Sequence, residues 1–249
     1  MVFSNKRWIE NEFLTASFGD ARLKTRFNKL MLSFSKNGQD NISKTFCHWS
    51  EMKACYRFIS NSKVTTNKIL TPHSKETVIR AKKFETVLLL QDTTFIPYSN
   101  REKAIDFDIL NSKKTGTRIK GLMLHNSLAI SETGIPLVIF NQEFIVRKEV
   151  KPRGNCYRPL HYAKTYIEKE SYRWMNTVNL SLTEDWGNTQ VVHITDREGD
   201  VYEFYQDCNI LNQSFIVRTS QNRNIKTGES NKSTWKLFDY LESQKAIKK

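Results

Sequence analysis

The first part of the chain has apolar positions spaced as in amphipathic helices. Over residues 21–30, Leu23, Phe27 and Leu30 fall on one helical face, and basic side chains occupy much of the rest. The dipeptide Asn37-Gly38 is typical of a turn and marks the end of this helical run. The pattern therefore predicts a helix that packs one apolar face against neighbouring elements.

Further helices are predicted at residues 51–59 and 74–84. Pro72 is expected to break the helical pattern before the second of them, because proline lacks the backbone N–H that a helix interior needs. The whole of residues 1–84 is thus predicted to be a small helical domain.

The pattern changes at residue 86. Residues 86–91 form an almost wholly apolar run, which is typical of a strand buried on both faces. The elements predicted after it are a hairpin of strands 122–130 and 135–145 around the turn 131–134, a helical segment 161–180, a strand 190–195, a helix 201–211, a strand 214–218, a polar loop 221–234 and a helix 234–241. This order predicts an α/β (α+β) fold in which residues 85–249 form a mixed sheet with flanking helices, consistent with a ribonuclease-H-like core.

Composition narrows the class of protein. The chain has 249 residues, of which 39% are hydrophobic and 12% aromatic, and such a composition argues against intrinsic disorder. No apolar run approaches the length of about 20 residues that a membrane span needs, and the N-terminus lacks the apolar segment of a signal peptide. The four cysteines are Cys47, Cys55, Cys156 and Cys208, and no two of them have the spacing of a metal site or a redox motif. Their scattered positions favour reduced thiols and a cytoplasmic protein.

Positive charge is concentrated near the N-terminus. The formal net charge is +13, from 39 basic and 26 acidic residues. Residues 1–90 hold 16 basic and 7 acidic residues, a net of +9, so most of the excess lies in the predicted helical domain. A phosphate backbone is one partner for such an excess, and a lysine-rich surface that only maintains solubility is the other interpretation.

Two aspartates follow predicted strands. Asp92 comes directly after the run 86–91, and Asp196 comes directly after the run 190–195. If these strands are neighbours, both carboxylates meet at one edge of the sheet, where two hard oxygen ligands suit Mg²⁺ or Mn²⁺. The alternative is that both are turn formers or helix caps, with Glu198 and Asp200 as first-turn residues that interact with a helix dipole.

The sequence around these aspartates resembles the bacterial insertion-sequence transposases of the Tn-five type. The segment Leu88-Leu89-Leu90-Gln91-Asp92-Thr93-Thr94 is similar to the family's first catalytic-aspartate motif, and Thr195-Asp196-Arg197-Glu198-Gly199-Asp200 is similar to its second. Further similar segments occur in the family's order; they are Phe18-Gly19-Asp20-Ala21-Arg22, Ala54-Cys55-Tyr56-Arg57-Phe58-Ile59, Glu168-Lys169-Glu170-Ser171 with Trp174, and Trp235-Lys236-Leu237-Phe238-Asp239-Tyr240-Leu241.

The resemblance implies a cut-and-paste DNA transposase. Asp92 and Asp196 would be its first and second catalytic carboxylates and would bind Mg²⁺ or Mn²⁺. Arg22, Lys24 and Arg26 would lie on a helix that contacts the double-stranded DNA of transposon ends, within a dimeric synapse. Such phosphate contacts position a protein on DNA and do not read its sequence.

The family's third catalytic carboxylate has no counterpart here. It is a glutamate in a Tyr-x-x-Arg-x-x-x-Glu-x-x-x-x-x-x-Lys motif, and nothing after Asp196 has that pattern. We therefore expect a truncated transposase that is catalytically incomplete, and binds DNA without cutting it. The alternatives are a non-catalytic DNA-binding fragment that occupies transposon ends, and a metal-dependent nuclease of related fold that uses Glu229 or Glu242 as a third ligand.

Overall fold

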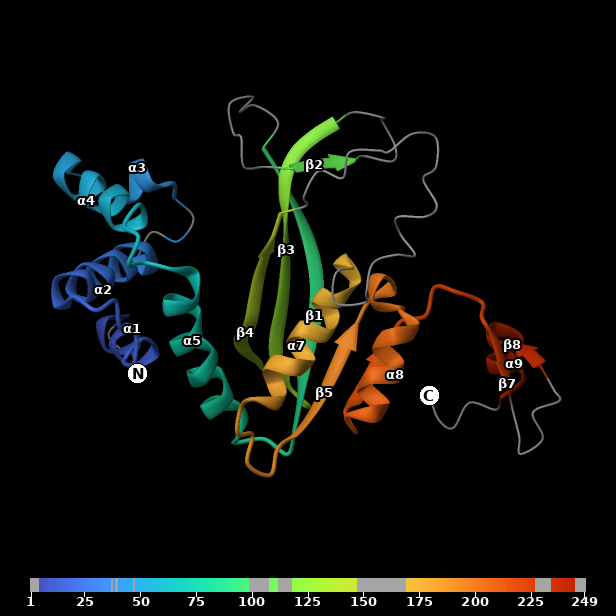
Figure 1. The fold of residues 1–249 in the computed structure, drawn as a ribbon. Coiled ribbons are helices and arrows are strands. Elements are labelled where there is room, and N and C mark those ends of the chain that lie inside the picture. The colour runs from blue at the N-terminus through green and yellow to red at the C-terminus, as the bar shows by residue number, and fades with distance from the viewer. Residues whose placement is uncertain are drawn as a thin grey trace.

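The protein consists of a helical region, a central sheet and a small C-terminal unit, arranged along the chain in that order (Figure 1). This computed structural model describes residues 5–98 (except 37, 39 and 47), 108–111, 118–146, 169–226 and 234–244. The predicted mixed α/β architecture, helices first and then a sheet with flanking helices, is confirmed.

Phenylalanines form the core of the helical region. Its helices are α1 (Asn5–Glu12), α2 (Ala21–Lys36), α3 (Ile42–Thr45), α4 (Trp49–Ile59) and α5 (Thr66–Ala81). Phe27 of α2 has its ring centroid 5.0 Å from that of Phe13, 5.3 Å from that of Phe18 and 5.9 Å from that of Phe58. Since all four are buried, the apolar face predicted for α2 is the face that holds the helices together.

The predicted break at Pro72 is wrong. Helix α5 begins at Thr66, after the Thr65 side chain accepts a hydrogen bond from the backbone N of Lys68, and it continues through Pro72 to Ala81. The helix also packs against the sheet, where Thr77 donates a hydrogen bond from its hydroxyl to the carbonyl of Ile139 at 3.1 Å. Packing of a buried helix thus outweighs the single backbone hydrogen bond that proline removes.

One mixed sheet occupies the centre of the molecule. Its strands are β1 (Thr86–Pro97), β2 (Asp108–Asn111), β3 (Arg118–Ser131), β4 (Pro136–Ile145), β5 (Gln190–Thr195) and β6 (Ser214–Val217). Their order is β2-β3-β1-β5-β6, with β4 also paired to β3. Strand β1 runs antiparallel to β3 and parallel to β5, so the predicted hairpin and the two predicted buried strands meet around it.

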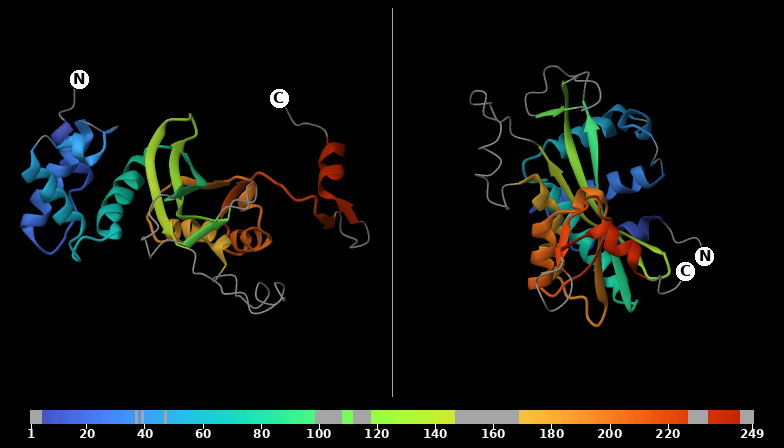
Figure 2. Two further views of the ribbon diagram at one scale, coloured as in Figure 1. Left: turned by 90° about the horizontal axis from the view of Figure 1, so that it is seen from above. Right: turned by 90° about the vertical axis from the view of Figure 1, so that its right-hand side faces the viewer.

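Helices cover one face of this sheet. Helices α5, α7 (Arg173–Leu182) and α8 (Tyr202–Ile210) all pack there, on a face to which β1 contributes Val87 and Leu89, neither of them exposed (Figure 2). We call it the covered face. The opposite, open face carries side chains that are only half-buried or are exposed; they are Leu88, Leu90, Leu128, Ile130, Val192, Ile194 and Ile216. In the described part of the chain, the expectation that residues 86–91 are buried on both faces is therefore wrong.

The C-terminal part differs from its prediction in two short strands, since residues 224–226 of the predicted loop and residues 234–236 of the predicted helix are both strands. The predicted polar loop 221–234 includes strand β7 (Asn224–Lys226), which pairs antiparallel with β8 (Thr234–Lys236) ahead of α9 (Leu237–Ser243). A strand of three residues is too short for its periodicity to be recognised in a sequence. Residues 161–168 of the predicted helical segment, and Asn37, Cys47, Cys156 and Glu229, lie outside the described residues.

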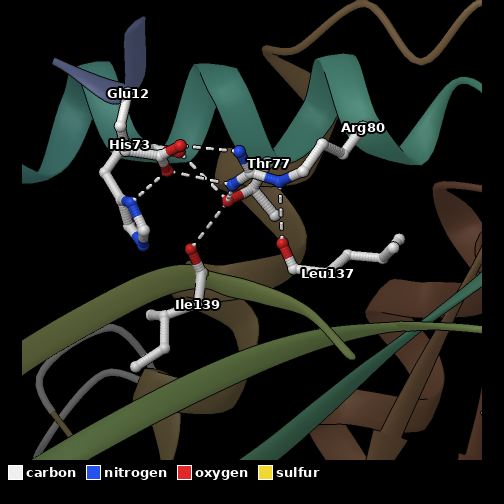
Figure 3. A network of polar contacts seen from close by, with 6 residues as sticks. All are labelled: Glu12, His73, Thr77, Arg80, Leu137 and Ile139. Atoms are coloured by element: carbon white, nitrogen blue, oxygen red, sulfur yellow. Dashed lines mark hydrogen bonds and ion pairs between the residues drawn. The ribbon is translucent and has the colours of Figure 1, made fainter. Parts of the chain in front are cut away.

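A buried ion-pair network joins the helical region to the sheet (Figure 3). Glu12 at the end of α1 is only 2% exposed, and its carboxylate accepts hydrogen bonds from Arg80 of α5 at 2.7 and 3.0 Å. Nδ1 of His73 lies 2.6 Å from the same carboxylate. Arg80 also donates a hydrogen bond from Nε to the carbonyl of Leu137 in β4, at 3.0 Å. One arginine therefore fixes α1 and α5 against the sheet edge.

Candidate functional site

Asp92 and Asp196 occupy matching positions on neighbouring strands. Strands β1 and β5 are parallel, and the last pair in their register is Gln91 with Thr195. Asp92 directly follows Gln91, and Asp196 directly follows Thr195, so both aspartates lie where the pairing of β1 with β5 ends. Their roles as catalytic and metal-binding residues stay predictions.

Asp92 lies inside its strand, whereas the sequence suggests that the strand ends before it. Strand β1 continues to Pro97 because β3 remains paired with it beyond this point, Asp92 itself opposite Asn126. The pairing with β5, by contrast, stops at Gln91. Asp92 therefore lies where β1 is still paired with β3 on one side but no longer with β5 on the other, beside the turn that follows β5.

Both aspartates belong to the open face. Successive side chains of a strand point to opposite faces, so Asp92 shares its face with Leu88 and Leu90. Thr195 is buried on the covered face, and Asp196 follows it with an extended backbone (φ −80°, ψ −165°), which places Asp196 on the open face too. Both residues are exposed, so the two carboxylates are accessible from solvent.

The capping interpretation of Asp196 also holds. Its Oδ1 accepts a hydrogen bond from the backbone N of Glu198 at 2.9 Å, at the start of a short 3-10 turn over Arg197–Gly199. Within the described residues, the second oxygen of Asp196 and both oxygens of Asp92 make no hydrogen bond or ion pair. Cap formation therefore orients Asp196 and leaves one of its oxygens available.

The carboxylate oxygens of Asp92 and Asp196 are suitable ligands for a hard divalent cation. Two accessible carboxylates on neighbouring strands match the one or two that Mg²⁺ takes from proteins, its other positions being filled by water and phosphate oxygens. Among the residues that the structure describes, no group of three histidine, cysteine or acidic side chains forms. Glu242, on α9, thus does not join the two aspartates.

A chain of polar contacts lies on the covered face beside Asp92. The hydroxyl of Thr93 lies 2.9 Å from Nδ1 of His125, whose Nε2 lies 3.1 Å from Oε1 of Gln91. Burial, and secondly the charge of Arg173, lowers the pKa of His125 to about 4, so the ring is neutral near pH 7. The contacts are mutually consistent when that neutral ring carries its proton on Nε2.

Asp200 has a different role from the one expected. It is not a first-turn residue that interacts with a helix dipole but a buried anchor for the segment after β6. Its carboxylate accepts hydrogen bonds from the backbone N of Ser220 at 2.6 Å, the backbone N of Gln221 at 2.9 Å and the hydroxyl of Tyr205 at 2.7 Å, and it pairs with Arg223. Although burial opposes the change, these hydrogen bonds lower the pKa of Asp200 to about 2.

The three basic residues predicted to contact DNA differ in their availability. The side chain of Arg22 projects into solvent, and its Nη2 lies 3.1 Å from Oδ2 of Asp20. Lys24 donates a hydrogen bond from Nζ to the carbonyl of Phe13, just after the end of α1, and burial lowers its pKa. Arg26 is half-buried on α2. Of the three, Arg22 is therefore the most accessible, and Lys24 also holds α1 to α2.

Helix α4 presents a second basic surface, which was not among the residues predicted to contact DNA. Trp49 is 69% exposed and Tyr56 is 51% exposed, and the side chains of Lys53 and Arg57 are exposed on the same helix. We call these four residues the α4 aromatic–basic face. Their spacing of four, three and one residues places them on one side of a helix, so a helical plot of exposed aromatics could have identified them.

The helices that carry these basic residues fall within a match to a known family. Residues 5–64, which include α1 to α4, match a family of transposase DNA-binding domains. This match supports a transposase or DNA-binding role and implies DNA as a partner. None of the helices in the described residues is long and apolar enough to cross a membrane.

Proposed function

We propose that this chain is the end-binding and partial catalytic portion of a cut-and-paste DNA transposase of the Tn-five type. Residues 5–64 bind the double-stranded DNA at the ends of the mobile element. Asp92 and Asp196 are the first two carboxylates of the centre for phosphoryl transfer. The chain by itself binds this DNA without cutting it.

One observation carries the proposal. The region that matches transposase DNA-binding domains is held, through Glu12 and Arg80, against the same sheet that carries Asp92 and Asp196 in adjacent register. A rigid connection of this kind suits a protein that must present a bound DNA end to a fixed reaction centre, because catalysis of phosphoryl transfer depends on positioning.

DNA binding is assigned to exposed cations and aromatic rings of the helical region. Lys53 and Arg57 on α4, with Arg22 at the start of α2, supply charge for phosphates. The exposed rings of Trp49 and Tyr56 supply flat apolar surface beside that charge, which suits contact with sugars and bases. The α4 aromatic–basic face and Arg22 thus supply the cations and rings to which DNA binding is assigned.

The metal site is assigned to the open face. Asp92 and Asp196 would hold Mg²⁺ or Mn²⁺, and the hydrogen bond from the backbone N of Glu198 would keep Asp196 oriented toward it. When bound, such ions activate a water molecule or a DNA 3′-hydroxyl and stabilise the leaving oxygen. Losing one member of a cooperating catalytic group typically lowers the rate by orders of magnitude, so two carboxylates without the third are expected to be inactive.

A non-catalytic role is the second candidate function. If the catalytic centre is incomplete, the chain acts only as a DNA-binding protein. It would occupy transposon ends and block a complete enzyme from binding them. The observation that favours this role is that Asp92 and Asp196 have no third acidic, histidine or cysteine partner among the described residues.

DNA binding can be tested by fluorescence anisotropy. The probes are labelled duplexes from both ends of the element that carries the gene and a duplex of shuffled sequence, titrated at several salt concentrations. Replacing Lys53 and Arg57 by glutamine should weaken binding and lower the magnitude of the salt slope by about 2, about 1 for each phosphate that is no longer neutralised. The matched control replaces Lys75 and Lys83, which are exposed outside the α4 face, and should leave both quantities unchanged.

Cutting is tested on the same end duplexes with Mn²⁺ present. We expect retention of DNA without nicking. Efficient nicking that Asp92→Ala abolishes would contradict the proposal of an incomplete centre and keep the transposase assignment. An affinity that does not respond to salt or to the α4 substitutions would contradict the assigned DNA surface.

A further inference from the structure

We propose that Arg173 is a positioning residue that holds the segments carrying Asp92 and Asp196 in a common geometry. The inference rests on the proposed metal-binding role of these two aspartates. Arg173 is the first residue of α7, on the covered face, and it contacts neither carboxylate. It acts instead through the residues next to them.

The guanidinium group of Arg173 uses each of its nitrogens. Nε donates a hydrogen bond to the hydroxyl of Thr93 at 2.9 Å, and Nη2 donates one to Oε2 of Glu198 at 2.8 Å. Nη1 donates to the backbone carbonyl of Glu170 at 2.9 Å, and the group also lies 5.1 Å from the ring centre of Trp174. A planar fork with donors in several directions is what arginine offers and lysine does not.

Through Glu198, Arg173 reaches Asp196. The side chain of Glu198 is held by Arg173, and the backbone N of Glu198 donates the hydrogen bond that orients Asp196. The 3-10 turn that follows Asp196, over Arg197–Gly199, is compact. A Cβ on Gly199 would lie 2.4 Å from Oγ1 of Thr195, so only glycine allows this close approach.

Through Thr93, Arg173 reaches Asp92. Thr93 is the next residue of β1, and its hydroxyl accepts the Arg173 hydrogen bond while it can donate to Nδ1 of His125. His125 is buried and, because its pKa is lowered to about 4, neutral near pH 7, so it places no second positive charge beside the guanidinium group. The position of β1 at Asp92 is thus fixed from the covered face, and the carboxylate stays free on the open face.

Arg173 is a charged residue that is almost fully buried, and such burial is unfavourable unless other groups stabilise the charge. The residue is 9% exposed, while its one acidic partner among the described residues, Glu198, is exposed, so the pair is not a well-compensated buried ion pair. Removing charge from water is unfavourable unless hydrogen bonds replace the lost hydration. Here the replacing hydrogen bonds go to both site-bearing segments, and this is the feature that suggests a positioning role.

The same part of the chain offers a matched control. Lys169, four residues earlier, forms an ion pair with Glu203 of α8 at 2.9 Å. It joins the start of the α7 region to α8 and makes no contact with Thr93 or Glu198 among the described residues. Removing Lys169 therefore tests the loss of a nearby positive charge and ion pair without disturbing the connection to the aspartates.

The test measures Mn²⁺ affinity of the full chain, from the free Mn²⁺ signal in electron paramagnetic resonance. Arg173→Met should weaken Mn²⁺ binding by about 10-fold or more, the range typical for the loss of groups that orient metal ligands. Arg173→Lys should be intermediate, and Lys169→Met should match the original chain. Thr93→Val, which changes no charge, should also weaken binding, and it decides the question if Arg173→Met does not fold.

The outcomes separate the two proposals. If Asp92→Asn and Asp196→Asn leave Mn²⁺ affinity unchanged, the aspartates do not hold the ion, and the proposed metal role and this inference fail together. If those variants lose the ion but folded Arg173→Met or Thr93→Val retains the original affinity, the metal role stands and only the positioning role of Arg173 is overturned.

Discussion

The two faces of the central sheet differ in what they do for the molecule. On the covered face, Val87 and Leu89 are fully buried under α5 and α7. On the open face, their neighbours Leu88 and Leu90 are only half-buried, and Ile216 is 57% exposed. Asp92 and Asp196 belong to this second face. Apolar burial on one face thus provides stability, while the carboxylates are presented on the other.

The site can be both rigid and accessible because its supporting hydrogen bonds and its carboxylates lie on opposite faces of the sheet. Residues that fix β1 and the turn after β5 lie on the covered face, where Arg173 and His125 make their hydrogen bonds away from solvent. Neighbouring residues of a strand point to opposite faces of the sheet. A residue held by hydrogen bonds on the covered face therefore also fixes the backbone position of the aspartate next to it, while the carboxylate itself stays exposed on the open face. Substitutions on the two faces should therefore have separable effects.

The largest effect is expected from two adjacent leucines. Leu89→Ala should lower the free energy of unfolding by about 2–5 kcal/mol, because it leaves a cavity in a fully buried cluster. Leu90→Ala removes the same atoms from the open face and should cost about 1 kcal/mol, since less apolar surface is lost from burial. Urea unfolding of both variants measures the difference. Equal losses would contradict the assignment of the two faces.

A smaller effect is expected from the histidines of the covered face. Burial lowers the pKa of His193, and burial together with Arg173 lowers that of His125, in both cases to about 4. Between about pH 6.5 and pH 4 the unfolded chain takes up these protons and the folded chain does not, so stability falls as the pH falls. The loss for each histidine should reach up to about 3 kcal/mol at pH 4.

Unfolding free energies measured across this pH range test the histidine effect. His193→Asn should remove part of the pH dependence, whereas His48→Asn, at an exposed position, should leave it intact. A stability that is flat from pH 7 to pH 4 would show that the two rings are not buried in the neutral form.

Features that periodicity encodes could be predicted from the sequence. Strand β5 has the predicted bounds, and the hairpin of β3 and β4 follows from two apolar runs separated by a turn. The pairing of β1 with β5, which is only a condition in the sequence-based prediction, is supplied by the structure. Features that depend on tertiary partners were not predictable. Continuation of α5 through Pro72 requires its packing on the sheet, and extension of β1 beyond residue 91 requires pairing with β3.

The candidate site follows the same division. The pair of aspartates could be proposed from strand ends, but nothing local distinguishes a buried Arg173 or Asp200 from surface charges. Both are recognised only by partners far along the chain, such as Thr93 for Arg173 and Ser220 for Asp200. Long-range pairing of this kind is invisible to spacing and periodicity.

The most direct test of the shared metal site is cleavage of the polypeptide by bound iron. Fe²⁺ takes the place of Mg²⁺, and ascorbate with peroxide then generates radicals that cut the backbone next to the ion. The account predicts two metal-dependent cuts, one beside Asp92 and one beside Asp196, which excess Mg²⁺ suppresses and which both vanish in Asp92→Asn. Cuts at only one of these positions, or none at either, would contradict a cation held jointly by the two strands.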